Sequence, residues 1–490
     1  MSYDSPRLSS EHYECGLPFT FDQFSRCSYG CSYCFAGPIK DSARDGEGLQ
    51  KFDHVDVEAF KRMFTAEPAS LSHDRRLIRQ RFIDNRLVLH WGGLADPFDP
   101  VARGKMRHVT IALLRFLSEI KYPILFSTKG DFYGDAEIME LFRENATRWG
   151  TQHSIITYDP VIAAAVEERV PTPQERIKTM EALAKQGNLT ILRLRPFSPG
   201  ISTGSYVELI RASVAAGARA ISTEFLCIPF AEFAFAKEAF TEMGRTAGFS
   251  DYVQMYRQFS GKKRGQPRLT REWKKPYVFT MYEEAKVKGG MVFGISDPDF
   301  KELNDTPGCC GLGGEMLEGG SVTTGQFTQA IRLAFRNGTV RWSEIAKDVE
   351  ATLSGWGRKI GRRGQNDELR TLRQEDMAGY QRRIWNQPTR HSVSPFRFFA
   401  KAMVPCGVDP GTGDLVYAFV YKVGLYDSAA ELARLGVGPG GVAEFEAQRK
   451  GIAPGEYSAR GLAPVPPQPP ASLPVLGAND EEAGCGSCPS

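Results

Sequence analysis

Short apolar runs alternate with helix-like segments over the first half of the chain, between residues 19 and 226. Strands that alternate with helices of ten or more residues pair as parallel neighbours, so the pattern predicts a parallel sheet flanked by helices. We expect an α/β fold, a partial (β/α)6-type parallel barrel, with chemistry at the carboxyl ends of its strands. The apolar runs are PFTFDQF, LVLHWGG (87–93), PILFST (123–128), HSIIT (153–157), TILRLRP (190–196) and AISTEFLCI (220–228), and the helix-like segments span 104–120, 135–146, 172–186 and 205–217.

The segment at 172–186 begins with a capping pattern. Thr172 precedes Pro173, and Glu175 follows three residues after Thr172. A threonine hydroxyl and a glutamate at this spacing satisfy each other's backbone N–H groups, and proline suits the first helical position. The pattern predicts that a helix starts at Pro173.

The rhythm changes after residue 226. Aromatic and basic residues dominate 230–290, and an apolar run at 290–296 leads into GCCGLGG. Charged, helix-like sequence follows, and a proline-rich stretch near the end indicates an extended linker. We expect an N-terminal extension at 1–18, the barrel at 19–229, a barrel extension that shapes the substrate pocket at 230–335, a mostly helical C-terminal domain at 336–462, and a linker with a flexible cysteine-containing tail at 463–490.

Composition places the 490-residue chain among ordinary globular proteins. The hydrophobic fraction is 42% and the charged fraction 24%, so a sizeable core can be buried. A net charge of +3 gives no whole-protein argument for nucleic-acid binding. The N-terminus lacks a basic start followed by an apolar run, and no stretch reaches the length of a membrane-spanning helix. We expect a cytoplasmic protein without membrane association.

The strongest chemical signal is the cysteine loop, residues 24–36, which contains Cys27, Cys31 and Cys34. Three thiolates at this spacing can bind three irons of a cubane cluster and leave the fourth iron without a protein ligand. Gly30 gives the loop freedom to wrap, because glycine tolerates positive φ. The alternative is a zinc site or three structural cysteines, but zinc would need a fourth ligand, for which His12 and Cys15 are the near candidates.

The Cys-x3-Cys-x2-Cys spacing, with Tyr33 before the last cysteine, resembles the radical S-adenosylmethionine (SAM) superfamily. The resemblance implies a [4Fe–4S] cluster on Cys27, Cys31 and Cys34, with SAM chelating the open iron. It also implies reductive cleavage of SAM to a 5′-deoxyadenosyl radical that abstracts hydrogen from a substrate. An electron donor such as flavodoxin or ferredoxin is implied as a partner.

The ends of the later runs extend the resemblance. Gly92 and Gly93 resemble the glycine-rich strand end that holds the methionine part of the cofactor; Leu94 stands where the family often has glutamate, and Asp96 can substitute. A strand-to-loop turn explains two glycines equally well. Residues 19–230 resemble the spore photoproduct lyase branch, often labelled DNA-repair-photolyase-like, in a Thr-Lys strand end, a Pro-x-x-Arg before a helix and a proline after the fifth run. The implied cofactor-binding residues are Gly92, Gly93, Asp96, Thr128, Lys129, Arg195 and Glu224.

Several of these side chains have an ordinary structural alternative. Arg176 and Arg195 either contact the cofactor or an anionic substrate, or serve as surface salt bridges or helix charges. Glu224 either meets the ribose or is a satisfied polar residue at a strand end. The isolated Cys227 is best interpreted as small apolar filler.

Other cysteines allow further chemistry. Cys309 and Cys310 are adjacent, and Cys485 and Cys488 have a chelating spacing. One interpretation is that these four cysteines bind a second iron–sulfur cluster. The other is that Cys309 or Cys310 presents a thiol to the substrate.

Three functional hypotheses remain open from the sequence. The first is a radical enzyme acting on a nucleobase or nucleic acid, in which Tyr256, Phe259 and Trp273 of the basic stretch 256–275 would stack on bases. The second is a radical enzyme acting on a small metabolite or peptide. The third is a non-catalytic iron–sulfur or zinc protein that binds or senses.

Overall fold

The computed structural model describes residues 6–9, 11–34, 36, 53–228, 234–260, 267–357, 375–391, 393–399 and 401–420. The chain forms two compact units. The first consists of Met1–Thr328 and Lys347–Tyr380, and the second of Gln329–Ala346 and Gln381–Ser490. The predicted linker and tail, with Cys485 and Cys488, lie outside the described residues. No helix in the described ranges is long and apolar enough to cross a membrane.

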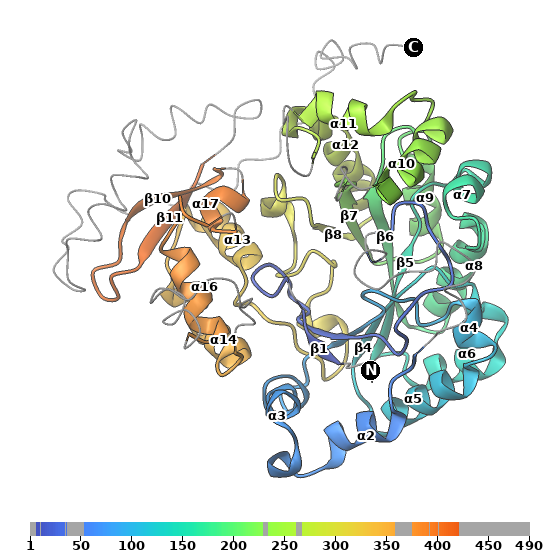
Figure 1. The fold of residues 1–490 in the computed structure, drawn as a ribbon, viewed down its shortest axis with the longest axis horizontal. Coiled ribbons are helices and arrows are strands. Elements are labelled where there is room, and N and C mark those ends of the chain that lie inside the picture. Colours follow the sequence, from blue (N-terminus) through green and yellow to red (C-terminus); the bar gives the residue numbers. More distant parts are fainter. Residues whose placement is uncertain are drawn as a thin grey trace. The chain divides into compact units, whose positions relative to one another are not determined.

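The first unit contains an eight-stranded sheet whose strands lie in chain order (Figure 1). The short β1 is antiparallel to β2, and every later pairing is parallel. This is the α/β architecture of a partial (β/α) barrel. The strands are β1 (Arg7–Leu8), β2 (Phe19–Phe21), β3 (Leu89–Trp91), β4 (Ile124–Thr128), β5 (Trp149–Ser154), β6 (Leu189–Phe197), β7 (Ala220–Phe225) and β8 (Val292–Ile295).

The parallel part has one strand more than the six that the sequence predicts. β8 comes from the apolar run at 290–296 in the expected barrel extension, and it pairs with β7 from Ala220↔Val292 to Thr223↔Ile295. The preceding insertion, helices α10 to α12, interrupts the regular alternation along the chain, so the rhythm alone did not identify this strand.

The fifth strand of the sheet also differs from the prediction. It spans Trp149–Ser154 and is shifted toward the N-terminus relative to HSIIT at 153–157. Its middle is polar, and hydrogen bonds satisfy part of these groups: Gln152 Nε2 donates to the Cys310 carbonyl at 2.9 Å, and the Thr151 hydroxyl pairs with His153 Nε2 at 2.9 Å within the strand. Apolar patterning misses a strand whose polar side chains find partners only after folding.

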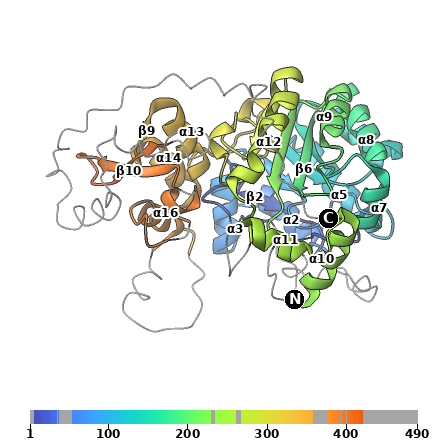
Figure 2. The same cartoon turned by 90° about the horizontal axis from the view of Figure 1, so that it is seen from above.

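Helices cover the outer face of the sheet (Figures 1 and 2). The four predicted helices are present within a few residues, and α8 has the predicted capping box between Thr172 and Glu175. The helices of the first unit are α2 (Val57–Thr65), α3 (His73–Ile78), α4 (Pro100–Arg103), α5 (Arg107–Glu119), α6 (Ala136–Glu144), α7 (Pro160–Val166), α8 (Pro173–Lys185), α9 (Tyr206–Ala215), α10 (Ala234–Ala247), α11 (Tyr252–Ser260) and α12 (Arg271–Tyr282).

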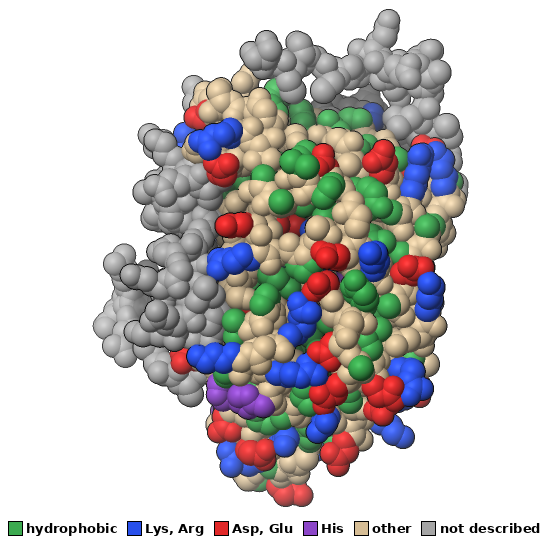
Figure 3. Space-filling model, turned by 90° about the vertical axis from the view of Figure 1, so that its right-hand side faces the viewer, with side chains coloured by type: hydrophobic (Ala, Val, Ile, Leu, Met, Phe, Trp, Pro, Cys, Tyr) green, Lys and Arg blue, Asp and Glu red, His purple; other side chains and the backbone are tan. Residues whose placement is uncertain are grey.

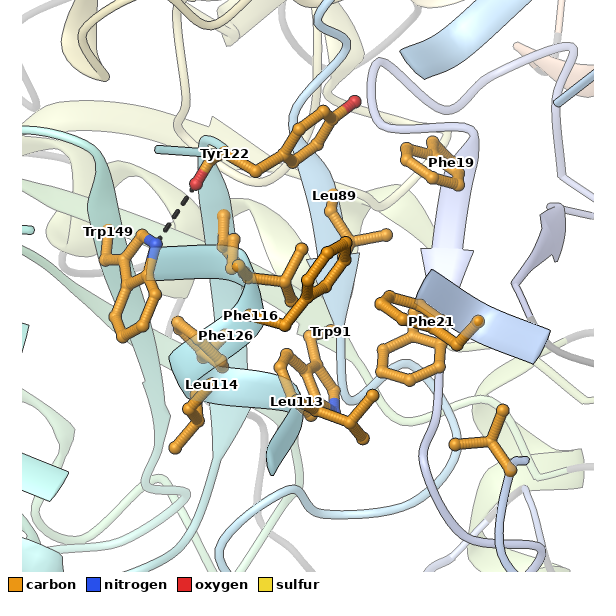
Figure 4. Close-up of a cluster of buried hydrophobic side chains, with 14 of the residues drawn as sticks. Phe19, Phe21, Leu89, Trp91, Leu113, Leu114, Phe116, Tyr122, Phe126 and Trp149 are labelled. Carbon is orange, nitrogen blue, oxygen red and sulfur yellow. Dashed lines mark hydrogen bonds between the residues drawn. The ribbon is translucent and has the colours of Figure 1, made fainter. Parts of the chain in front are cut away.

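The outer face of the first strands packs an aromatic core (Figure 4). Phe21, Trp91 and Phe126 follow one another across β2, β3 and β4 with ring centroids 4.8 and 5.2 Å apart. The Trp149 indole N–H donates to the Tyr122 carbonyl at 3.0 Å, so its one polar atom is satisfied. All of these rings are buried, and burial of such side chains stabilises the fold by about 1.5–3 kcal/mol each.

The inner face of the sheet changes character along the strands. Near the strand starts it is apolar, and Leu125, Ile191 and Ala220 pack against Leu17 and the loop 308–312. Alternate residues of a strand point to opposite faces, so Arg193 and Arg195 share the inner face with Ile191. The inner face therefore turns polar and charged at the carboxyl ends, where a site can form.

The second unit contains a three-stranded antiparallel sheet in the order β10–β11–β9. Trp385 anchors its core: the indole N–H donates to the Leu415 carbonyl at 2.7 Å, and the ring lies 4.8 Å from Tyr417. The expected C-terminal domain is thus mixed over its described part. The remaining elements are α13 (Phe327–Asn337), β9 (Thr339–Val340), α14 (Ser343–Leu353), α16 (Met377–Trp385), α17 (Pro395–Phe398), β10 (Met403–Val408) and β11 (Leu415–Phe419).

Candidate active site at the carboxyl ends of the strands

The cysteine loop follows directly after β2. Asp22 fixes its start, because one carboxylate oxygen accepts hydrogen bonds from the backbone N–H groups of Leu94 and Ala95, both at 2.8 Å. Gly30 has φ +67°, and a Cβ there would clash with the guanidinium of Arg169. The left-handed backbone therefore favours glycine here, whereas the Arg169 side chain could move aside.

A buried ion pair anchors the end of the loop. The Tyr33 hydroxyl donates to Glu167 Oε1, and Arg176 Nη2 lies 2.7 Å from Glu167 Oε2. Arg176 Nη1 also donates to the Ser154 carbonyl at 2.7 Å. The Arg176 and Glu167 side chains are 0% and 1% exposed. Arg176 therefore forms a salt bridge with Glu167, and this salt bridge is buried, not at the surface.

Asp96 links the ends of β3 and β4. Its carboxylate accepts hydrogen bonds from the Thr128 hydroxyl at 2.7 Å, the Lys129 backbone N–H at 2.6 Å and the Phe98 N–H at 2.9 Å. The structure thus brings three of the predicted cofactor-binding residues together, but the Asp96 and Thr128 side chains are engaged with each other. Burial raises the pKa of Asp96 to about 6.

The two predicted glycines differ in their surroundings. Gly92 has φ +100°, and a Cβ there would lie 2.8 Å from Pro97 Cδ, so close packing alone requires glycine. A Cβ added at Gly93 would have His90 Cε1 as its nearest neighbour, at 4.0 Å, which leaves open space beside the backbone. Gly93 is therefore the residue with room for a bound group.

Desolvation is the main influence on the Cys27 and Cys31 thiols of the loop. Burial raises the pKa of Cys27 well above its ordinary value, and the nearby Asp99 and Asp96 raise it further. Burial also raises the pKa of Cys31 to about 12, although Lys129 opposes that effect. Without a metal these thiols stay protonated, whereas a bound cationic metal would favour their thiolates.

The three loop cysteines are the candidate ligands for a metal cofactor. No group of three or more His, Cys, Asp or Glu side chains among the described residues is arranged to hold one metal ion. A cubane cluster places its three thiolates on three different irons, so the sulfurs need not converge on one point. Electrostatic coupling joins Cys31 to Cys34, and Lys129 acts on Cys31 as a counter-charge. Cys27, Cys31 and Cys34 are therefore the residues that would hold the cluster.

A second charged group lies on the inner face of β6 and β7. Arg195 and Glu224 form an ion pair, and Arg195 Nη1 also donates to Cys309 Sγ at 3.8 Å. Lys301 Nζ lies 2.6 Å from Glu14 Oε2. Burial would raise the pKa of Glu224, but the cations around it, Arg195 first, outweigh burial and lower it. We call Arg195, Glu224, Lys301, Glu14 and Cys309 the thiolate group.

The neighbours of Cys309 favour its thiolate form. A hydrogen bond from the Cys310 thiol has the largest effect, and with Lys301, Arg195 and Ser296 it outweighs burial and holds the pKa of Cys309 well below its ordinary value. The pKa of Cys310 is correspondingly raised. The loop backbone is fixed by the Ser222 hydroxyl, which donates to the Cys309 carbonyl at 2.9 Å.

The N-terminal segment supplies part of this second group, which the sequence did not indicate. Glu14 pairs with Lys301, and Cys15 is electrostatically coupled to Cys309. Gly16 packs against Gly308 so closely that a Cβ would lie 2.9 Å from Gly308 Cα. No local signal could have found these residues, because 287 positions separate Glu14 from Lys301 along the chain.

The aromatic residues proposed to stack on bases do not form an open platform. Tyr256 is fully buried, which contradicts a stacking role, and Trp273 packs against Phe225 with its ring 6.2 Å away. Residues 261–266 of this stretch lie outside the described residues. On the face shown in Figure 3, Lys and Arg side chains are interspersed with Asp and Glu. That face therefore presents no continuous basic surface.

No family model matches the chain, and no curated protein matches it. Among solved structures, a spore photoproduct lyase mutant is similar at TM-score 0.41 and 12% identity, over 58% of this chain and 78% of that one. A second such mutant, with bound AdoMet and dinucleoside spore photoproduct, gives TM-score 0.38 and 13% identity over 55% and 74%. The radical S-adenosylmethionine methyltransferase TsrM from Kitasatospora setae gives 0.29 and 15% over 44% and 37%. The function of this protein is therefore inferred from its own residues.

Proposed function

We propose that this protein is a radical SAM enzyme. The observation that carries the proposal is the cysteine loop, which leaves β2 of a parallel sheet and brings Cys27, Cys31 and Cys34 to the carboxyl ends of the strands. In such sheets the functional groups lie at that edge. When bound there, a [4Fe–4S] cluster with SAM would supply a 5′-deoxyadenosyl radical that abstracts hydrogen from a substrate.

The position of each residue in the site suggests its role in the proposed enzyme. The cysteine loop would hold the cluster, and the Glu167–Arg176 pair would keep the loop in place through Tyr33. The backbone at Gly93 has room for the methionine part of SAM. Arg195 and Glu224, on the same inner face, would border the cofactor on its substrate side. Flavodoxin or ferredoxin would deliver the electron.

The first test is anaerobic. The protein is reconstituted with iron and sulfide, reduced with dithionite and supplied with SAM, and 5′-deoxyadenosine is measured. Wild type should form the nucleoside, and the triple variant Cys27→Ala, Cys31→Ala, Cys34→Ala should form none. Cys406→Ala, which removes a buried cysteine of the second unit, is the matched control and should behave as wild type.

Two outcomes would contradict the proposal. If the triple variant forms as much nucleoside as wild type, the cysteine loop is not the site. If wild type carries a full cluster and forms none, even with candidate substrates present, the cluster is structural or sensory and a non-catalytic iron–sulfur protein becomes the better hypothesis.

A further inference from the structure

Arg193 lies on the inner face of β6, two residues before Arg195. The alternation along the strand places Ile191, Arg193 and Arg195 on this face, while Leu192 and Leu194 pack into the outer core. Arg193 is only partly buried. It therefore lies between the apolar floor and the thiolate group, and neither the cluster loop nor SAM needs it in the function proposed above.

The cations of the thiolate group already have anionic partners. Arg195 pairs with Glu224 and contacts Cys309, and Lys301 pairs with Glu14. Arg193 differs, because none of the described residues accepts a hydrogen bond or forms an ion pair with its side chain, and its Nε is buried without any partner. Within the described part of the inner face, Arg193 is thus a guanidinium whose donors are unused.

Electrostatics strengthen the need for an anion at this point. Burial and the neighbouring Arg195 lower the pKa of Arg193, and Cys310, Glu224 and Cys309 oppose this without forming a hydrogen bond or ion pair with it. A guanidinium remains protonated in proteins. Two like charges two residues apart on one face of a strand repel each other in a partly desolvated setting. An anion between or beside them would relieve both the repulsion and the unsatisfied N–H groups.

Among the described residues of the inner face, exposure is greater at the carboxyl ends of the strands than near their starts. Leu125, Ile191 and Ala220 near the strand starts are fully buried. By contrast, the Arg195 and Glu224 side chains are 15% and 27% exposed, and Cys27 is partly exposed. Arg193 is itself only partly buried, so its guanidinium lies at the more exposed end of this face.

We propose that Arg193 binds an oxyanion of the substrate, a carboxylate or a phosphate. The planar fork of a guanidinium matches both groups through two parallel hydrogen bonds. The substrate class of the site is accordingly a molecule with such an anionic group, held deeper in the sheet than the cofactor. This inference rests on the proposed function for the statement that the ligand is a substrate, whereas the anion site itself does not depend on it.

The test measures anion binding directly, with calorimetric titration of reconstituted protein. Inorganic phosphate and succinate are the two probes, and they distinguish a phosphorylated from a carboxylated ligand. Wild type should bind at least one of them, and Arg193→Gln should weaken that binding at least tenfold. Arg193→Lys, which keeps the charge and loses the fork, should weaken it less. Arg219→Gln is the matched control, because Arg219 is an exposed arginine at the start of β7.

The outcomes separate this inference from the proposed function. Equal binding by wild type and both Arg193 variants, or no binding of either probe, would overturn the anion site whether or not 5′-deoxyadenosine forms. Displacement of the bound probe by an equivalent of SAM would assign Arg193 to the cofactor and also overturn it. Arg193-dependent binding that persists with SAM bound supports the inference, and if such protein forms no 5′-deoxyadenosine, only the proposed function fails.

Discussion

Two sets of thiols lie on the first unit, and they differ in the charges around them. Desolvation and the nearby carboxylates Asp96, Asp99 and Glu167 raise the pKa values of Cys27 and Cys31, against the opposing cations Lys129 and Arg176 near Cys31. Cys309 is also buried, but Cys310, Lys301 and Arg195 surround it, and its pKa is lowered. The same functional group is therefore neutral in one place and anionic in the other.

This difference in pKa indicates which set of thiols requires a bound metal to ionise. A thiol in an anionic, desolvated setting ionises only when a cationic metal binds it, which suits a ligand. A thiol whose neighbours already supply positive charge is a thiolate without metal, and its charge is balanced by the protein itself. We infer that the cysteine loop depends on a cluster for its charge balance and that the thiolate group does not.

The largest effect expected from this comparison is on bound iron. Wild type should hold about four iron atoms per chain, as one [4Fe–4S] cluster requires. Cys27→Ala should lose most of this iron, and the double variant Cys309→Ala, Cys310→Ala should keep it. Iron analysis after anaerobic reconstitution measures both.

A different iron content would contradict the conclusion that only the cysteine loop binds iron. About eight iron atoms per chain in wild type, falling to about four in the Cys309→Ala, Cys310→Ala variant, would show that these residues bind the second cluster considered from the sequence.

The next effect is on stability. Glu167→Ala leaves the fully buried Arg176 without its carboxylate, which should lower the free energy of unfolding by about 3–5 kcal/mol. Glu224→Ala should cost less, because Arg195 is partly exposed and keeps Cys309 as a partner. Chemical denaturation of both variants measures the difference.

An exposed ion pair supplies the control for this prediction. Glu181→Ala removes a carboxylate whose partner Lys185 is 72% exposed, so it should cost about 1 kcal/mol or less. If Glu167→Ala is no more harmful than Glu181→Ala, the cysteine loop is not anchored by the buried pair.

The smallest effect concerns a single charge. In iron-free protein at pH 7, Cys309 should be a thiolate, because its lowered pKa keeps it ionised until the pH falls through that pKa. Cys309→Ala should therefore lose thiolate ultraviolet absorbance at pH 7, and Cys406→Ala should not, because burial raises the pKa of Cys406 to about 12. Equal spectra for wild type and Cys309→Ala across the neutral range would remove the contrast between the two thiol sets.

Local patterns predicted much of the fold. The apolar runs located most strands of the sheet, and the capping pattern at Thr172 located the start of α8. The strand β8 and the true position of β5 were missed. β8 follows a long helical insertion, and β5 has polar residues whose partners, such as the Cys310 carbonyl for Gln152, are remote in sequence.

The candidate site also has a part that the sequence predicted and a part that it did not. The spacing of Cys27, Cys31 and Cys34 is a local property of one short loop, so the sequence alone determined that motif. Glu14, Arg195, Lys301 and Cys309 come from four separate segments, and only the tertiary structure decided that they meet. The physical reason is that ion pairs and pKa shifts depend on distance in space and on burial, and neither is encoded in the spacing of residues along the chain.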